Sequence, residues 1–263
     1  MSAAIGVVLV DKERGPSSFA VVRRVGRRFG AKAGHAGTLD PFATGLLVCL
    51  VGRATRLARY LVGLDKRYLV TIRLGVRTTM GDVEGEELEA TPIASTAEIE
   101  ALRGEVELPV PAASAVKIDG ERAYRLHRRG VAVELPMRRS TVHGLELVRY
   151  DPPEVVLALH VSSGTYVRSL ADALGGHCVD LRRLAVGPLR VEEADEGRLE
   201  PPLAAVPHLP RRELAGDELA LVTTGRPVGA VGHEGPLALT FAGELVAVAQ
   251  AAGDVARPET VLA

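Results

Sequence analysis

Tryptophan is absent from this 263-residue chain, and cysteine and aromatic residues are scarce. The two cysteines, Cys49 and Cys178, are too few for a disulfide scaffold or for the paired thiols of a structural zinc site, which favours a reducing compartment. Aromatic residues make up only 3% of the chain. The chain is nevertheless long enough to bury a large aliphatic core, so we expect a globular protein that folds without covalent cross-links.

Long apolar runs and nucleotide-binding loops are also missing. The apolar stretch of residues 3–10 has no basic flank and leads directly into Asp11 and Lys12, a pattern that is typical of neither a signal peptide nor a membrane span. We therefore expect a cytoplasmic protein with no membrane contact. The chain has no glycine-rich dinucleotide motif, no Walker loop and no calcium-loop spacing, so we expect neither a cofactor nor a metal.

Charge is balanced overall but segregated along the chain. The totals are 32 Lys and Arg against 33 Asp and Glu, yet residues 1–80 hold 14 basic and 4 acidic side chains, whereas residues 81–110 hold 1 basic and 9 acidic. Because phosphate neutralisation dominates the affinity of proteins for nucleic acids, the basic part could bind a polyanion. An arginine-rich face can also simply be solvated. We expect the acidic residues 82–89 to form a surface loop.

The hydrophobic periodicity predicts strands and helices without a regular βαβ rhythm. Residues 66–74 alternate, with Tyr68 on the apolar face, as expected for a half-buried strand. The irregular mixture favours an α+β fold, with a mixed, largely antiparallel sheet and flanking helices. The other predicted elements are strands at 5–10, 140–148 and 154–161, and helices at 17–29, 54–62, 95–104, 123–129 and 165–174.

The predicted helix at 17–29 has two different sides. Its basic side carries Arg23, Arg24, Arg27 and Arg28, and its apolar side carries Phe19, Val22, Val25 and Phe29. We expect the apolar side to face the core and the basic side to face solvent or a polyanion.

A change of character near residue 210 predicts a domain boundary. Prolines cluster at positions 201, 202, 207 and 210, and short strand-like runs separated by glycines follow. We expect one large domain over residues 1–210 and a second unit over residues 216–263, which is too short for a large core and fits a small β-barrel.

The most informative segment is residues 34–45, which read Gly-His-Ala-Gly-Thr-Leu-Asp-Pro-Phe-Ala-Thr-Gly. It places one acid, Asp40, between two glycine-rich turns, and Pro41 fixes the backbone just after it. Such a loop usually presents a side chain to a ligand. An Asp-Pro pair can also start a helix, with the carboxylate as its cap.

This segment resembles the hallmark Gly-His-x-Gly-x-Leu-Asp-Pro-x-Ala-x-Gly of the tRNA pseudouridine synthase B family. Further blocks resemble the family's signatures in the same order, over about residues 5–190. Glu13 departs from the family pattern, which commonly has proline there, although Lys12 is in place. The matching blocks are residues 6–12, 15–18, 65–68, 114–117, 120–124, 164–169 and 181–183.

The resemblance implies the pseudouridine synthase fold followed by a PUA-like RNA-binding domain. It also implies an enzyme that isomerises the T-loop uridine of tRNA, position 55 in tRNA numbering, to pseudouridine on a flipped-out base without a cofactor. Asp40 would be the nucleophile, Arg168 its ionic partner, and Tyr68 the group that stacks on uracil and helps to remove a proton. Residues implied or suggested to contact RNA are His35, Lys12, Lys117, Tyr166, Leu181, Arg23, Arg24 and Arg27, with Lys12 and Lys117 as phosphate or loop-positioning groups.

Other functions stay open at this point. The basic segment and the PUA-like tail would equally suit a non-catalytic module that binds or folds tRNA, and a guide-RNA-dependent pseudouridine synthase would share the same catalytic loop. An Asp-dependent glycosidase would need a second carboxylate as its acid, and no motif supplies one. We expect the T-arm stem-loop of tRNA as the partner, no obligate protein partner, and a monomer.

Overall fold

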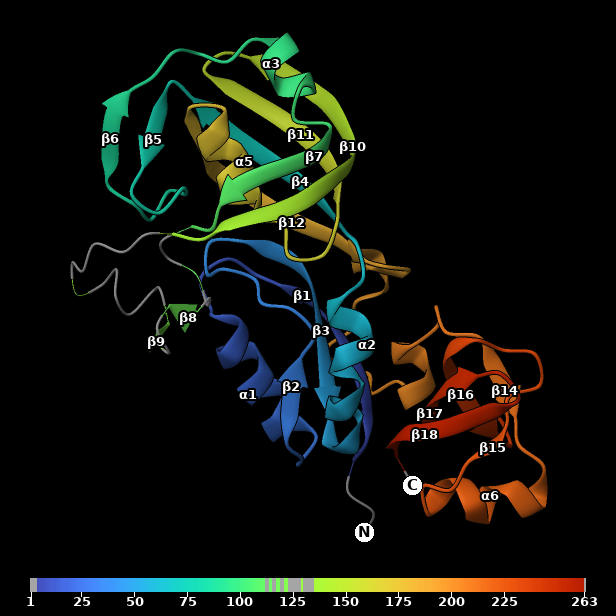
Figure 1. The fold of residues 1–263 in the computed structure, drawn as a ribbon. Coiled ribbons are helices and arrows are strands. Elements are labelled where there is room, and N and C mark those ends of the chain that lie inside the picture. The colour runs from blue at the N-terminus through green and yellow to red at the C-terminus, as the bar shows by residue number, and fades with distance from the viewer. Residues whose placement is uncertain are drawn as a thin grey trace.

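The computed structural model describes residues 4–111, 114, 117–118, 121–122, 129 and 135–262. Its centre is a nine-stranded sheet with the order β1-β3-β12-β4-β11-β10-β7, to which β2 adds beside β3 and β13 beside β12 (Figure 1). These strands are β1 (Gly6–Lys12), β2 (Ala33–His35), β3 (Thr44–Val51), β4 (Lys66–Leu74), β7 (Gly104–Pro109), β10 (Met137–Asp151), β11 (Glu154–Val161), β12 (Gly176–Val186) and β13 (Leu189–Arg190).

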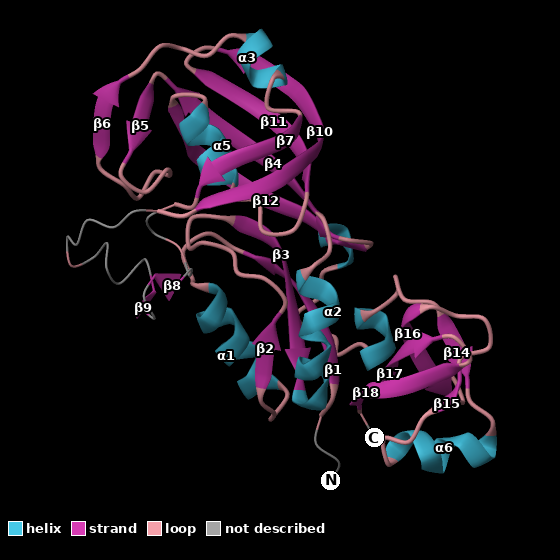
Figure 2. Cartoon of the chain, in the orientation of Figure 1, coloured by secondary structure: helices cyan, strands magenta, loops and turns pink. Residues whose placement is uncertain are grey.

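Neighbouring strands of this sheet are antiparallel, except that β12 runs parallel to the start of β3. The prediction of a mixed, largely antiparallel sheet with flanking helices is therefore confirmed. Figure 2 shows how few helices accompany the strands. Among the described residues before position 211, they are α1 (Ser18–Arg28), η1 (Gly52–Ala58), α2 (Arg59–Val62), α3 (Thr96–Glu100), α5 (Val167–Ala173), η2 (Val191–Glu193) and η3 (Pro202–Ala205).

Apolar residues cover both faces of β1 and β3, because these strands lie between two layers of helix. Val21, Val22 and Val25 of α1 belong to the same buried cluster as Val8 and Cys49. Leu57 and Leu61, from η1 and α2, belong to a second cluster with residues from the opposite side of the strands. Near-continuous burial along β3 follows from this arrangement.

The predicted elements mostly form where expected. Helix α1 begins after the N-cap Ser17, whose side chain accepts a hydrogen bond from the amide of Ala20, and α3 begins with the predicted Ser95–Glu98 capping box. Strand β4 buries alternate residues from Lys66 to Leu74, including Tyr68. The predicted helix at 123–129 lies outside the described residues except for position 129.

Two expectations for local structure are wrong. Phe19 does not face the core: its side chain is 65% exposed, because Ser18 takes the buried position and hydrogen bonds to Leu39. The acidic segment is not a simple surface loop, since its last residues belong to β6 (Glu87–Ala90), which forms a hairpin with β5 (Val76–Thr78). Its first acid, Asp82, is buried.

The C-terminal unit is a five-stranded, partly open half-barrel with the order β14-β16-β17-β18-β15. Figure 1 shows it beside α2 and β1, on the side of the molecule away from α3 and α5. Its elements are β14 (Arg211–Glu213), α6 (Gly216–Thr223), β15 (Val228–Gly229), β16 (Gly235–Phe241), β17 (Glu244–Ala252) and β18 (Val255–Val261).

The C-terminal unit is attached tightly to the large domain. The Arg56 guanidinium donates to the carbonyl of Val261 at 2.7 Å, and the Tyr60 hydroxyl lies 3.1 Å from that of Thr260. Leu262 shares a buried apolar cluster with Leu57 and Leu61 of the large domain. The two units therefore have a common core. Within the described ranges, no helix has the length and apolar character of a membrane span.

Candidate active site

The loop that carries Asp40 leads directly into a strand. Residues 40–43 form no helix and β3 begins at Thr44, so Asp40 does not cap a helix. Gly37 and Gly45 have φ values of 113° and 96°, which only glycine adopts without strain. A Cβ at Gly45 would also collide with the backbone of Arg183. Gly37 and Gly45 are thus required by the path of the loop.

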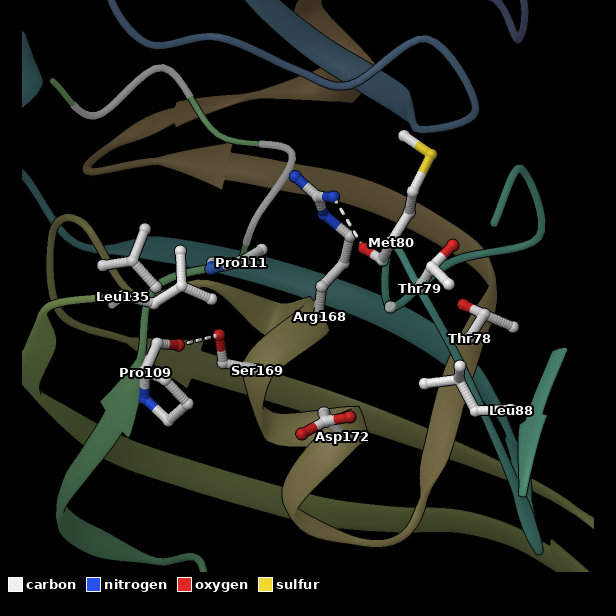
Figure 3. Close-up of a pocket in the computed structure, with 12 residues that line it drawn as sticks. Thr78, Thr79, Met80, Leu88, Pro109, Pro111, Leu135, Arg168, Ser169 and Asp172 are labelled. Atoms are coloured by element: carbon white, nitrogen blue, oxygen red, sulfur yellow. Dashed lines mark hydrogen bonds between the residues drawn. The ribbon is translucent and has the colours of Figure 1, made fainter. Parts of the chain in front are cut away.

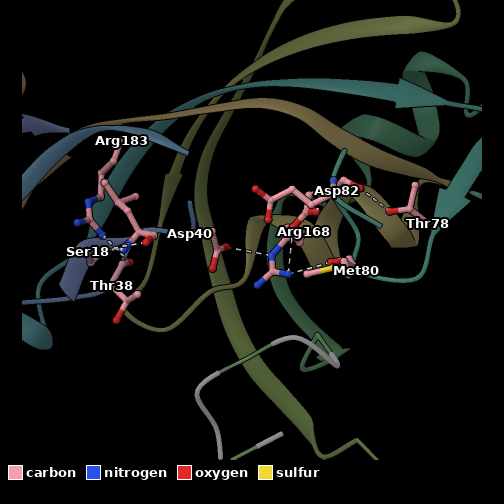
Figure 4. Close-up of polar contacts among 10 residues, drawn as sticks. Ser18, Thr38, Asp40, Thr78, Met80, Asp82, Arg168 and Arg183 are labelled. Carbon is pink, nitrogen blue, oxygen red and sulfur yellow. Dashed lines mark hydrogen bonds and ion pairs between the residues drawn. The ribbon is translucent and has the colours of Figure 1, made fainter. Parts of the chain in front are cut away.

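Buried polar side chains hold this loop on the N-terminal side of Asp40. The Arg183 guanidinium donates to the carbonyls of Gly37 at 3.0 Å, Thr38 at 3.3 Å and Leu46 at 2.7 Å. The Ser18 hydroxyl donates to the Leu39 carbonyl at 2.7 Å and accepts from the Leu39 amide at 2.8 Å. In Figure 4, this group lies on one side of Asp40 and Arg168 lies on the other.

Lys12 holds the loop on the C-terminal side of Asp40. Its ammonium group donates to the carbonyls of Glu13 at 2.9 Å, Pro41 at 3.1 Å and Ala43 at 2.6 Å, and the residue is fully buried. Burial lowers the pKa of Lys12, and the nearby Asp40 carboxylate opposes that shift. Of the two roles predicted for Lys12, this geometry fits loop positioning and corrects the expectation of a phosphate contact.

Arg168 joins Asp40 to a second acid. Its Nε lies 3.1 Å from a carboxylate oxygen of Asp40, and its Nη1 lies 3.3 Å from a carboxylate oxygen of Asp82 and donates to the Met80 carbonyl at 2.8 Å. Side-chain exposure is 4% for Arg168, 2% for Asp82 and 34% for Asp40. Asp40 is therefore the member of this chain of charges that can reach a ligand (Figure 4).

The sequence did not reveal Asp82 as part of the site. Burial raises the pKa of Asp82, whereas the Arg168 guanidinium acts in the opposite direction. Asp82 also accepts a hydrogen bond from the amide of Glu84 at 3.0 Å. In the sequence, Asp82 differs from its neighbours only by its position just after Gly81, in the turn that follows β5. The other acidic residues of the segment made that difference hard to recognise.

A cavity of about 340 Å³ lies in front of the Asp40 carboxylate. It brings together five residues predicted from distant parts of the sequence, and Tyr68 and Leu181 are both largely buried in its wall. Its lining also includes Lys66, Arg138 and Arg183, so the cavity combines apolar walls with several cationic groups. The five predicted residues are Asp40, Tyr68, Tyr166, Arg168 and Leu181.

Lys66 and Arg183 line the cavity but were not predicted as site residues. The Lys66 ammonium donates to the carbonyls of Val62 at 2.6 Å and Leu64 at 2.5 Å, and burial lowers its pKa to about 8. Each could have been inferred from strand alternation. Lys66 lies two residues before Tyr68 on β4, and Arg183 lies two residues after Leu181 on β12, so each shares a face with a predicted residue.

A second cavity, of about 200 Å³, is also lined by Arg168 (Figure 3). Thr78, Met80 and Pro109 contribute to its lining, and the Ser169 hydroxyl donates to the Pro109 carbonyl at 2.6 Å. Arg168 lines both cavities. Within the described ranges, no group of three His, Cys, Asp or Glu side chains could hold a metal ion.

Among the described side chains, five of the predicted RNA contacts are not part of the cavity lining: Lys12, Arg23, Arg24, Arg27 and His35. His35 is half-buried on β2, where burial lowers its pKa and its Nδ1 has no hydrogen-bond partner among the described residues. Arg24 forms a two-pronged ion pair with Glu196, at 2.6 and 2.8 Å, which corrects the expectation that it is free for RNA. Arg23 and Arg27 are exposed on α1. The side chain of Lys117 lies outside the described residues, although its backbone forms β8 (Lys117–Ile118) with β9 (Glu121–Arg122).

Comparison with known proteins gives a family match over more than half of the chain, including Asp40 and Tyr68. The family described as "TruB family pseudouridylate synthase (N terminal domain)" matches residues 24–167. A tRNA pseudouridine synthase B from Thermobifida fusca (strain YX) is 44% identical over 291 aligned positions, which cover 99% of both chains. One from Aromatoleum aromaticum is 40% identical and covers 86% of this chain and 83% of the relative.

Solved structures share the fold at lower identity. A chain in a structure of an H/ACA RNP bound to a substrate RNA containing 2'-deoxyuridine has a TM-score of 0.72 and 23% identity, covering 98% of this chain and 85% of that chain. A chain in a Cbf5-Nop10-Gar1 complex has a TM-score of 0.72 and 24% identity, covering 97% and 84%. At this identity the likeness establishes the architecture, including the C-terminal half-barrel.

Proposed function

Because the chain belongs to the TruB family of pseudouridylate synthases, we propose that it isomerises the T-loop uridine of tRNA, position 55 in tRNA numbering, to pseudouridine. The observation that carries this proposal is the Asp40–Arg168 ion pair at the edge of a cavity walled by Tyr68 and Leu181. The relatives named tRNA pseudouridine synthase B align with nearly the whole chain, which supports tRNA as the substrate.

The reaction breaks the bond between uracil N1 and the ribose and forms a bond from uracil C5 to the same ribose carbon. A proton leaves C5, and N1 gains one. Asp40 would act as the nucleophile, either at the ribose or at the base, because a carboxylate held by a guanidinium is ionised and fixed in direction. The Arg168 contact at 3.1 Å fixes the carboxylate, and its 34% exposure leaves it accessible.

Tyr68 would receive the uracil ring and assist the proton transfer. Its side chain is anchored by β4 and forms part of the cavity wall. A base in this cavity must have left the helical stack, and extruded bases are commonly held between aromatic and aliphatic side chains. We therefore assign the opposite apolar contact to Leu181, and we assign Tyr166, at the rim before α5, to the flanking nucleotide.

The partner would be the T-arm stem-loop, bound by one copy of the chain acting alone in the cytoplasm. We divide the chain into a catalytic domain over residues 1–210 and an RNA-associated PUA-like domain over residues 216–263. The second domain holds 2 Lys and Arg against 6 Asp and Glu. That negative charge favours a supporting contact for this domain over neutralisation of many phosphates.

A glycosidase reaction is the less suitable alternative. Asp82 is a second carboxylate near Asp40, but it is buried behind Arg168 and is not part of the lining of the larger cavity. A glycosidase acid must reach the leaving oxygen on the side of the bond opposite the nucleophile. The contacts of Arg168 with Asp40 and Asp82 argue against a purely RNA-binding module, because such a module needs no carboxylate held by a buried guanidinium at the edge of a cavity.

The test is to incubate the purified protein alone with unmodified tRNA and to map pseudouridine in the product. Wild type is expected to convert the T-loop uridine without added protein, guide RNA or cofactor. Asp40→Asn is expected to form no product while binding tRNA within about tenfold of wild type, about 1.4 kcal/mol, because size and polarity are kept. Comparable product formation by Asp40→Asn would remove the nucleophile assignment, and a need for a guide RNA would reassign the enzyme.

A further inference from the structure

An exposed strip on α1 carries one aromatic ring and two arginines in a row. Phe19, Arg23 and Arg27 recur every fourth residue, so they lie on one side of the helix, about 6 Å apart from one to the next. The Arg23 guanidinium lies over the Phe19 ring, 5.3 Å from its centroid. All three side chains are exposed. We call these three residues the α1 strip.

The exposure of Phe19 is unusual among the phenylalanines of this chain. The chain has four, and the others are buried or half-buried, whereas Phe19 is 65% exposed. A single exposed apolar side chain is common on folded proteins and by itself indicates nothing. Here the Phe19 ring forms a cation–π pair with Arg23. Aromatic rings and arginine side chains in such pairs also stack on nucleobases.

The charges of the strip are not neutralised within the described part of the chain. Arg24, one position away, is paired with Glu196 and Glu13. By contrast, neither Arg23 nor Arg27 has an ion pair with any described carboxylate, and no acidic residue lies in the first turn of α1. Among the described residues, the helix therefore presents two guanidinium groups without an ion pair beside an exposed aromatic ring, which complements a phosphate next to an unpaired base.

Hydrogen bonds link the start of the α1 strip to the loop that carries Asp40. Ser18, the residue before Phe19, exchanges two hydrogen bonds with Leu39, and Leu39 and Asp40 line the same cavity. The N-terminal end of α1 is therefore attached to the loop that lines this cavity. The occupant of the strip must be unpaired, because a base inside a duplex offers no free face for stacking.

We propose that the α1 strip binds an unpaired nucleotide of the substrate RNA, with its base stacked on Phe19 and its phosphates held by Arg23 and Arg27. This inference rests on the proposed function, because it takes the RNA in the cavity as the occupant. It adds a second base-binding position outside the catalytic pocket, which increases affinity and fixes the direction in which the RNA enters.

The experiment measures binding of a T-arm hairpin in an Asp40→Asn background, so that no RNA is converted. Phe19→Ala is expected to raise the dissociation constant about 5- to 140-fold, the range for loss of one stacked base. Phe19→Leu should have a similar effect, because it keeps apolar volume but has no π face, and Phe19→Tyr should bind like the parent. Val148→Ala, an equally open apolar position on β10 with 53% exposure, is the matched control.

Salt dependence and fluorescence make the assignment specific. Arg23→Gln and Arg27→Gln should each reduce the slope of log K against log salt by roughly 0.7–0.9, whereas Arg24→Gln should have a smaller effect because its charge is already paired. A hairpin RNA that carries 2-aminopurine at one unpaired position reports stacking by its fluorescence. That fluorescence should be quenched when the RNA binds the parent protein with Phe19, and it should not be quenched when the RNA binds Phe19→Leu. The proposal is overturned if Phe19→Leu binds the hairpin with the affinity of the parent, whether or not Phe19→Ala does so too.

Failure of the proposed function would look different. In that case, wild type with an intact Asp40 would form no pseudouridine in any tRNA, whatever the Phe19 variants do to binding. Thermal unfolding of each variant checks that the fold is retained, which an exposed position should permit.

Discussion

Replacing Lys66 with methionine should remove a pH dependence from the stability of this protein. Lys66 is largely buried in the wall of the catalytic cavity, where its ammonium group contacts two carbonyls and no carboxylate lies within ion-pair distance among the described residues. Burial lowers the pKa of this group from 10.5 to about 8. Methionine has a similar length and no charge, so the substitution removes the titration and keeps most of the volume.

The sign and the size follow from the two pKa values. Between pH 8 and 10.5, the unfolded chain holds a proton on Lys66 that the folded protein has released, so the free energy of unfolding rises with pH. The full difference is about 3.4 kcal/mol, at about 1.36 kcal/mol per pH unit. Roughly 2 kcal/mol of it lies between pH 8 and pH 10, because the titration curve is rounded near each pKa.

The assay is urea unfolding of wild type and Lys66→Met at pH 7, 8, 9 and 10. Burial raises the pKa of Cys49 to about 12, which has the opposite effect on stability above pH 9, so the mutant-minus-wild-type difference is the quantity to compare. That difference should fall by about 2 kcal/mol from pH 8 to pH 10. Arg67→Met, on the exposed face of β4, should show a constant difference. A constant difference for Lys66→Met as well would refute the buried-charge argument.

Three other perturbations test the site and the assembly. Arg168→Lys should lower the single-turnover rate by about 100-fold or more, because one ammonium group cannot contact Asp40, Asp82 and the Met80 carbonyl together. A small displacement of the proposed nucleophile is enough to slow the reaction to this extent. Near-native rates would show that the contacts of Arg168 with the two acids are dispensable. Tyr68→Phe should keep tRNA binding and lower the rate by about 10²- to 10⁴-fold if the hydroxyl moves a proton; a native single-turnover rate would leave only the stacking role. Deleting residues 216–263 should lower the melting temperature of the remaining domain, because the deletion exposes Leu57 and Leu61 to water. The expected loss of stability is about 1.5–3 kcal/mol for each side chain that becomes fully exposed. An unchanged melting temperature with weaker tRNA binding would mean that the tail only contacts RNA.

The parts of the fold that depend on local pattern could be predicted from the sequence. The alternation of β4 placed Tyr68 on the buried face, and the serine caps placed the starts of α1 and α3. The same reasoning failed at Phe19, because the burial of Ser18 depends on a hydrogen bond to Leu39, twenty-one residues away in sequence. A helical wheel contains no information about such a partner.

The candidate site was predictable where motifs carried it and not where tertiary contacts made it. Asp40 and Arg168 were found from motifs, whereas Asp82 was missed because its partner is 86 residues away and its own segment looks like an exposed acidic loop. Arg24 was interpreted as an RNA contact because Glu196, 172 residues away, could not be foreseen as its partner. Charge pairing across the sheet is the information that the sequence did not contain.

The contacts that hold the Asp40 loop also determine when the site can form during synthesis. Lys12 and Ser18 leave the ribosome before Asp40, but the Arg183 contacts join positions 137 to 146 residues apart. At about 5–20 residues per second, the 143 residues from 40 to 183 require roughly 7 to 30 s. During that interval the loop has its N-terminal supports and lacks the strand that completes them. The nascent chain therefore contains Asp40 early, but the loop around Asp40 has all its supports only after β12 has inserted between β3 and β4, so a chain truncated before residue 183 should form no pseudouridine even where its first helix and strands have folded.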